Sequence, residues 1–109
     1  MATELPGKLE RYFAAQNDHD VDAMAAAFAS DAEVVDEHRS YVGREAIREW
    51  KRETSAKYGI TVEPLSATDD GKIVSVVGRV AGNFPGSPAD LTYDFALDDA
   101  GFIRSLKIH

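Results

Sequence analysis

Cysteine is absent from this 109-residue sequence. Its absence excludes disulfide scaffolds, thiol nucleophiles and zinc sites built from thiolates. It also fits a reducing compartment, and we expect a cytoplasmic protein. No apolar run reaches the length of a membrane-spanning helix, and the segment Met1-Ala2-Thr3-Glu4 lacks the basic and apolar parts of a signal peptide. The sequence therefore predicts neither a membrane span nor a leader.

Positive charge is scarce, with 12 Lys and Arg residues against 19 Asp and Glu residues and a formal net charge of −7. Such an acidic surface disfavours nucleic acid or an anionic membrane as the main partner. The three histidines, His19, His38 and His109, have no metal-ligand spacing, and the acidic residues form no known metal-binding loop. We therefore expect no metal site and no cofactor.

Hydrophobic residues make up 44% of the chain, which argues against intrinsic disorder. A chain of this length has room for one domain with one core, so we expect a single domain over residues 1–109.

The first half of the chain has mostly helical periodicity. Apolar residues at helical spacing predict one helix over residues 5–16 and a second from residue 21 to about residue 30, with Asp20 as its cap. A short strand is expected at 32–37, followed by a polar, hairpin-like connection at 38–43. A third helix should begin at Arg44 and end before Gly59, which suits a left-handed stop.

The second half changes to the alternation of strands. Strands are expected at 60–65, from 74 toward 84, at 91–97 and at 102–108, and Pro64 marks the first of these as an edge or bulged strand. Their short turns predict an antiparallel meander covered by the helices on one face. The fold class is therefore α+β.

Several segments together resemble a known superfamily. Residues 11–15 and 28–32, followed by Val34 and Asp36, resemble the opening of ketosteroid isomerases, of SnoaL-like polyketide cyclases and of the wider nuclear transport factor 2-like superfamily. Residues 43–50 are similar to the third helix of that superfamily, and residues 98–103 to the turn before its last strand. The resemblance covers essentially the whole chain. It implies a curved, mainly antiparallel sheet with three helices on one face, forming a cone-shaped apolar pocket.

The resemblance also implies candidate catalytic residues. Asp36 matches the position of the carboxylate base of the isomerases, and Tyr12 matches their hydrogen-bond donor to the enolate oxygen. Tyr93 stands where those enzymes carry a second donor, a protonated aspartate, so this chain departs from the pattern there. Pocket-lining roles are expected for five further residues: Phe28, Val34, His38, Trp50 and Phe95.

Each candidate also has a structural interpretation. Asp36 shares a strand face with Val34, so it either faces an apolar pocket, which would raise its pKa, or lies at the strand end, where it is solvated or accepts hydrogen bonds from the following loop. Tyr12 and Tyr93 lie on apolar faces, where core packing is the commoner role. His38 either continues the face of Asp36 or lies exposed in the loop.

The charged residues of the third helix are expected on its solvated face. They are Glu45, Arg48, Glu49, Lys51, Arg52 and Glu53.

Three functions stay open at this point. The chain could be a cofactor-free isomerase, cyclase or dehydratase acting on an enolisable carbonyl compound, a non-catalytic binder of a small apolar or carbonyl-containing molecule, or a dimeric interaction domain. A homodimer is expected in any case, because Ile73 and Val77 lie on the sheet face opposite the predicted core.

Overall fold

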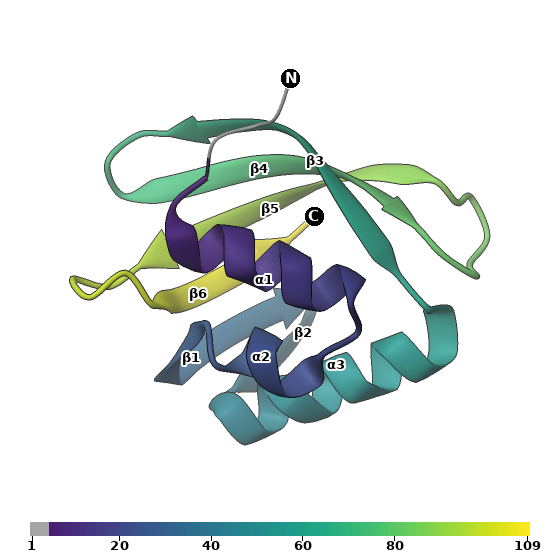
Figure 1. Cartoon of the computed structure of the whole chain (residues 1–109), viewed down its shortest axis with the longest axis horizontal. Helices are drawn as coiled ribbons and strands as arrows, with labels where there is room; N and C mark the ends of the chain where they lie inside the picture. Colours follow the sequence, from purple (N-terminus) through teal and green to yellow (C-terminus); the bar gives the residue numbers. More distant parts are fainter. Residues whose placement is uncertain (1–4) are drawn as a thin grey trace.

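The computed structural model describes residues 5–109, so residues 1–4, on which the prediction of no signal peptide rests, lie outside the described part (Figure 1). Among the described residues no helix is long and apolar enough to cross a membrane. The elements follow one another as α1 (Gly7–Asn17), α2 (Val21–Ala25), β1 (Phe28–Asp36), β2 (Arg39–Val42), α3 (Arg44–Tyr58), β3 (Thr61–Asp69), β4 (Ile73–Ala81), β5 (Ala89–Leu97) and β6 (Ile103–Ile108).

The six strands form one curved sheet in the order β2-β1-β6-β5-β4-β3. Strands β3 to β6 form the antiparallel meander that the short turns predicted, and β2 pairs antiparallel with β1. The single parallel pair joins β1 to β6. In Figure 1 the sheet curves around α1, with α2 and α3 beside β1 and β2. The α+β class and the curved, mainly antiparallel sheet with three helices are confirmed.

The second helix is shorter than predicted, because β1 begins at Phe28 rather than near residue 32. The Phe28 side chain is fully buried, and its carbonyl oxygen accepts hydrogen bonds from the Arg44 guanidinium at 2.9 and 2.7 Å. Packing in the sheet therefore outweighs the helical spacing that places Phe28 in line with Val21 and Met24. A register irregularity between Phe28 and Glu33 accommodates the early start of the strand.

The connection at 38–43 is a hairpin arm, and it contains β2, which was not predicted as a strand. The two-residue turn Glu37-His38 has φ values of 52° and 64°, the left-handed pair that matches the twist of a tight hairpin. Asp36 pairs with Arg39 directly across this turn. The hairpin thus fixes Asp36 at the last position of β1.

The predicted ends of α3 and the predicted irregularity in β3 are confirmed. Gly59 closes α3 with φ 58° and ψ 43°. The β3 strand lies at the edge of the sheet, and its register shifts between Pro64 and Ser66. Side-chain hydrogen bonds fasten α1 to β3, because Asn17 both donates to the Val62 carbonyl (2.9 Å) and accepts from the Val62 amide (2.7 Å).

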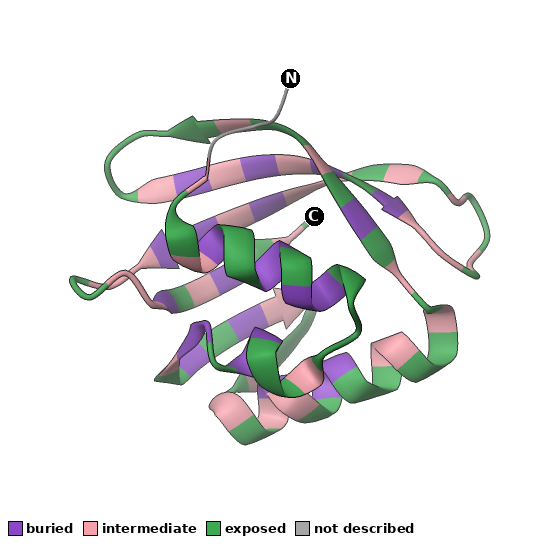
Figure 2. Cartoon of the chain, viewed as in Figure 1, coloured by how far each residue is buried: buried purple, intermediate pink, exposed green. Residues whose placement is uncertain are grey.

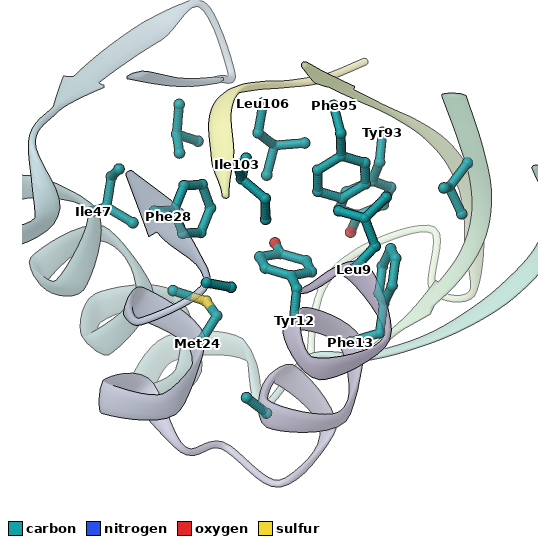
Figure 3. Close-up of a cluster of buried hydrophobic side chains, with 14 of the residues drawn as sticks. Leu9, Tyr12, Phe13, Met24, Phe28, Ile47, Tyr93, Phe95, Ile103 and Leu106 are labelled. Carbon is teal, nitrogen blue, oxygen red and sulfur yellow. The ribbon is translucent and has the colours of Figure 1, made fainter. Parts of the chain in front are cut away.

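The core lies between α1 and the sheet, and Figure 2 shows buried residues on the inward side of α1 and alternating along β4 and β5. At its centre the Tyr12 ring contacts Phe13, Phe28 and Phe95 edge-on, with centroid distances of 5.1, 5.8 and 5.5 Å (Figure 3). Such edge-to-face pairs are favourable beyond the area they bury. The cluster holds α1 firmly over the sheet, which fixes the position of Tyr12.

Candidate functional site

A cavity of about 430 Å³ opens beside the aromatic core. Residues of α1, β1, α3, β4, β5 and β6 contribute to its walls, together with the loop after β4. Its apolar wall includes Tyr58, Ile60, Val80, Phe84, Leu91 and Ile108. A volume of this size with a few converging polar groups is typical of sites for small organic molecules.

Four of the predicted site residues meet at this cavity: Tyr12 from α1, Asp36 from the end of β1, Trp50 from α3 and Tyr93 from β5. They come from segments far apart in the sequence. The long strand β5 and the hairpin β1–β2 bring them to the same end of the sheet.

Three residues predicted to line the pocket lie instead in the core. Phe28, Val34 and Phe95 are fully buried and do not border the cavity. The rings of Phe28 and Phe95 pack against Tyr12, and it is Tyr12 that contributes to the cavity wall (Figure 3). The alternation places these residues correctly on the inward face, but it does not distinguish core from cavity.

His38 does not line this cavity. It lies exposed in the β1–β2 turn, and it borders a second hollow with Val35, Lys107 and His109. The strand ends at Asp36, so the loop alternative is the one observed.

The Asp36 carboxyl group is half-buried at the cavity wall. Its pKa is raised above the usual value of 3.8, chiefly because burial disfavours the charged form. The indole Nε1 of Trp50 donates a hydrogen bond to Asp36 Oδ2 at 3.1 Å, which opposes that rise by stabilising the carboxylate. One carboxyl oxygen is thereby held in place, and a hydrogen bond from the backbone amide of Glu37, in the following turn, also stabilises the carboxylate.

The Tyr12 hydroxyl is buried and has no hydrogen-bond partner among the described residues. A buried hydroxyl without a partner costs about 1–3 kcal/mol and is uncommon in folded proteins. Burial raises the pKa of Tyr12, and the nearby Tyr93 and Asp36 raise it further. Tyr12 therefore stays protonated at neutral pH, as a hydrogen-bond donor without an acceptor.

Tyr93 is buried beside the same cavity, and burial followed by the charge of Asp36 raises its pKa as well. Its ring passes close to β4, where a Cβ atom on Gly78 would lie 3.4 Å from Tyr93 Cε1 and 2.7 Å from Val62 Cγ1. Gly78 thus leaves room chiefly for the Val62 side chain, next to the tyrosine ring. Three groups that influence one another electrostatically, Asp36, Tyr12 and Tyr93, share this site.

Lys51 was expected on the solvated face of α3, and the structure corrects this. Lys51 is only 5% exposed, and it lines the cavity. Burial lowers the pKa of its ammonium group to about 8, although the charge of Asp36 acts in the opposite direction. The signal was present in the sequence, because residues 47, 50, 51 and 54 lie on one side of a helix.

Comparison with known proteins identifies the family of this fold. A family model described as SnoaL-like domain matches residues 9–100. A protein from Sinorhizobium meliloti, provisionally named a polyketide cyclase, is 40% identical over 96% of this chain and 95% of its own, with a TM-score of 0.92. No protein with a curated description matches the sequence.

Two further solved structures are similar. The epoxide hydrolase/cyclase-like enzyme SalBIII, which has a role in pyran ring formation in the polyether salinomycin, is 26% identical, with a TM-score of 0.80 over 93% of this chain and 85% of its own. A protein from Catenulispora acidiphila with a ketosteroid isomerase-like fold, solved with trimethylamine, is 23% identical, with a TM-score of 0.85 over 97% of this chain and 86% of its own. The last likeness concerns the fold alone.

The match to the family model spans most of the chain, and the solved structures confirm the resemblance that residues 11–15, 28–36 and 43–50 carry. This chain belongs to the SnoaL-like domain family.

Proposed function

We propose that this SnoaL-like domain is a cofactor-free enzyme that moves a proton next to a carbonyl group, as an isomerase, cyclase or dehydratase does. The observation that carries the proposal is the pairing of a desolvated carboxylate, Asp36, with a buried, unpartnered hydroxyl, Tyr12, at one apolar cavity. The name of the polyketide cyclase agrees with this type of chemistry, and SalBIII is a further enzyme of similar structure.

In this proposal Asp36 is the general base. A carboxylate whose pKa is raised above the usual value is a stronger base than one in water. Asp36 takes a proton from the carbon next to the substrate carbonyl, and the electron pair of that C–H bond moves onto the carbonyl oxygen as an enolate. The protonated Asp36 then returns a proton, either the same one or one exchanged with solvent, to a carbon of the same molecule. The hydrogen bond from Trp50 orients the carboxyl group throughout.

Tyr12 and Tyr93 are the donors to the enolate oxygen. Their raised pKa values keep both hydroxyl groups protonated, so each has a hydrogen to donate as negative charge develops. Donors that are already in place inside an apolar site stabilise such charge more than water does, because they need no reorganisation.

A ligand binder without catalysis is the second candidate. The volume of the cavity favours it over a pure interaction domain, because the aromatic side chains of Trp50 and Tyr93 border about 430 Å³ of space and do not fill it. Both candidates require that a small apolar or carbonyl-containing molecule enters the cavity.

The experiment uses 4-phenyl-2-butanone, an apolar ketone with exchangeable α-protons, in D₂O. We expect the protein to accelerate the loss of the α-proton signals in the NMR spectrum, and we expect Asp36→Asn to abolish the acceleration. Binding of the ketone without any acceleration by the wild type would favour the non-catalytic binder.

A further inference from the structure

Lys51 is a cation placed inside the cavity. Lys51 follows Trp50 in α3 and is 5% exposed. Its Nζ atom lies 5.1 Å from the centre of the Trp50 ring. Asp36, the last residue of β1, is the acidic neighbour whose charge raises the pKa of Lys51. Among residues 5–109, however, the ammonium group makes no side-chain hydrogen bond and no ion pair.

An ammonium group in this position is costly. Removing a charge from water destabilises a protein unless an opposite charge and hydrogen bonds compensate for the loss. Lys51 lines a mostly apolar cavity, and no described residue accepts a hydrogen bond from its ammonium group. A ligand can supply an acceptor.

Lys57 shows that neither helix formation nor the contact with an aromatic ring requires this burial. It lies in the same helix, and its Nζ atom is also 5.1 Å from the ring of the residue that follows it, Tyr58. Its side chain is exposed, so its charge stays hydrated. The burial of Lys51 is therefore a property of the cavity.

We propose that Lys51 binds an anionic oxygen of the ligand, so that the molecule taken up is an apolar carboxylic acid. If the proton-transfer function above holds, on which this extension rests, the substrate is a keto acid whose carboxylate pairs with Lys51. A carboxylate is a better match than a neutral carbonyl, because its negative charge compensates for the buried charge of the ammonium group as well as accepting its hydrogen bonds.

The net charge of the whole chain does not oppose this assignment. Exposed charges are screened beyond about 8 Å at physiological ionic strength, whereas a charge inside a cavity is screened much less. The acidic side chains at the same cavity are Asp36 and Glu37, and Glu37 is exposed to solvent. Among the residues that line the cavity, Lys51 carries the positive charge, and it attracts an entering carboxylate.

The test compares two probes of one shape, 4-phenylbutyrate and its uncharged amide, 4-phenylbutanamide, by isothermal titration calorimetry at pH 7. We expect the wild type to bind the acid at least about tenfold more tightly than the amide. Lys51→Met keeps the length and apolar character of the side chain, and we expect it to abolish this preference. Lys57→Met is the matched control and should retain the preference in full.

The acid-to-amide ratio of the wild type is informative without any variant. Equal affinities, or a preference for the acid that survives in Lys51→Met, would overturn the assignment of Lys51. Tight binding of the amide with no preference for the acid would overturn the assignment of Lys51, but it would still show that the cavity binds a ligand. Binding of neither probe would overturn both this inference and the proposed function.

Discussion

Trp50 Nε1 donates a hydrogen bond to Asp36 Oδ2 at 3.1 Å, and this contact joins α3 to the last residue of β1. Because Trp50 is the single tryptophan of the sequence, its fluorescence reports directly on the candidate site. The contact also makes the two carboxyl oxygens different, because the indole donates to Oδ2 and not to Oδ1. The predictions below depend on this arrangement.

Asp36→Asn should leave the fold intact and raise the melting temperature by up to a few degrees at pH 7. The amide oxygen still accepts from Trp50, while the cost of a half-buried charge is removed. The folded pKa of Asp36 lies above its unfolded value of about 3.9, so wild-type stability falls as pH rises from that value through the folded pKa. The variant lacks this loss, and its advantage should therefore be larger at pH 7 than at pH 4.

Thermal melts of the two proteins at both pH values measure the effect. Asp94→Asn is the control of opposite sign: burial raises the Asp94 pKa, but hydrogen bonds with Ser75 and His109 outweigh burial and lower it. That variant should lose stability at pH 7. A clearly lower melting temperature for Asp36→Asn would show that the carboxylate has a structural role, and the assignment of Asp36 as a base would be wrong.

Tyr12→Phe should be neutral or stabilising while it reduces proton transfer. The hydroxyl that it removes is buried without a partner, so its loss relieves a cost of about 1–3 kcal/mol and keeps the ring contacts with Phe28 and Phe95. Deleting a donor to a developing oxyanion slows acyl-transfer enzymes by about 10²–10³-fold, and we expect a loss approaching that range.

Urea unfolding and the α-proton exchange rate give the two readouts for this variant. Tyr41→Phe, which removes a hydroxyl from the half-buried ring beside Trp50, is the matched control and should change neither. If Tyr12→Phe lost stability and kept full activity, its hydroxyl would have no part in the reaction.

Lys51→Met should stabilise the protein at pH 7, by up to about 3 kcal/mol, because burial lowers the pKa of Lys51 from 10.5 to about 8. Between pH 8 and about 10.4 the unfolded lysine holds a proton that the folded one has released, so wild-type stability rises with pH in this interval. The advantage of the variant should therefore shrink between pH 8 and pH 10.

Guanidinium unfolding followed through Trp50 measures this at pH 7 and pH 10. Lys57→Met serves as the control, because Lys57 is exposed, and its effect on stability should not change with pH in this way. A stability difference for Lys51→Met that is the same at both pH values would contradict the burial of the charge.

A homodimer is also expected, with a mass of two 11.9-kDa chains in light scattering at micromolar concentration. Ile73 and Val77 are half-buried and lie on the face of β4 opposite the buried Val74 and Val76. Val77→Asp places a charge in the middle of this face and should yield a monomer with an unchanged fold. A monomer mass for the wild type would refute the prediction.

Local patterns predicted most of the fold. The alternation in β4 and β5, the stop at Gly59 and the disruption at Pro64 are properties of short segments, and all were confirmed. Phe28 was assigned to a helix because its spacing fits one, whereas its partners in the structure, Arg44 and Ile103, are distant in the sequence. Periodicity carries no information about such partners.

The candidate site was predictable in part, for a similar reason. Asp36, Tyr12 and Tyr93 could be placed on inward faces, but the same reasoning placed Phe28 and Phe95 at the pocket, although they lie in the core. Whether an inward side chain meets another side chain or empty space depends on how the sheet curves. Lys51 was missed because a lysine on a charged helix is nearly always solvated, and its apolar surroundings come from residues distant in the sequence, among them Val80, Leu91 and Ile108.

The parallel ladder between β1 and β6 has a consequence for dynamics. Asp36, Trp50 and Lys51 belong to residues 28–58, whereas Leu91 and Tyr93 of β5 lie on the other side of that ladder, which is the single line of sheet hydrogen bonds between the two parts of the described chain. A molecule that touches both groups would act as a clamp across the seam and oppose its transient opening. Backbone amides of β1 and β6 would then exchange with deuterium more slowly when the cavity is occupied, so that slowed exchange along one ladder would reveal a ligand before its identity is known.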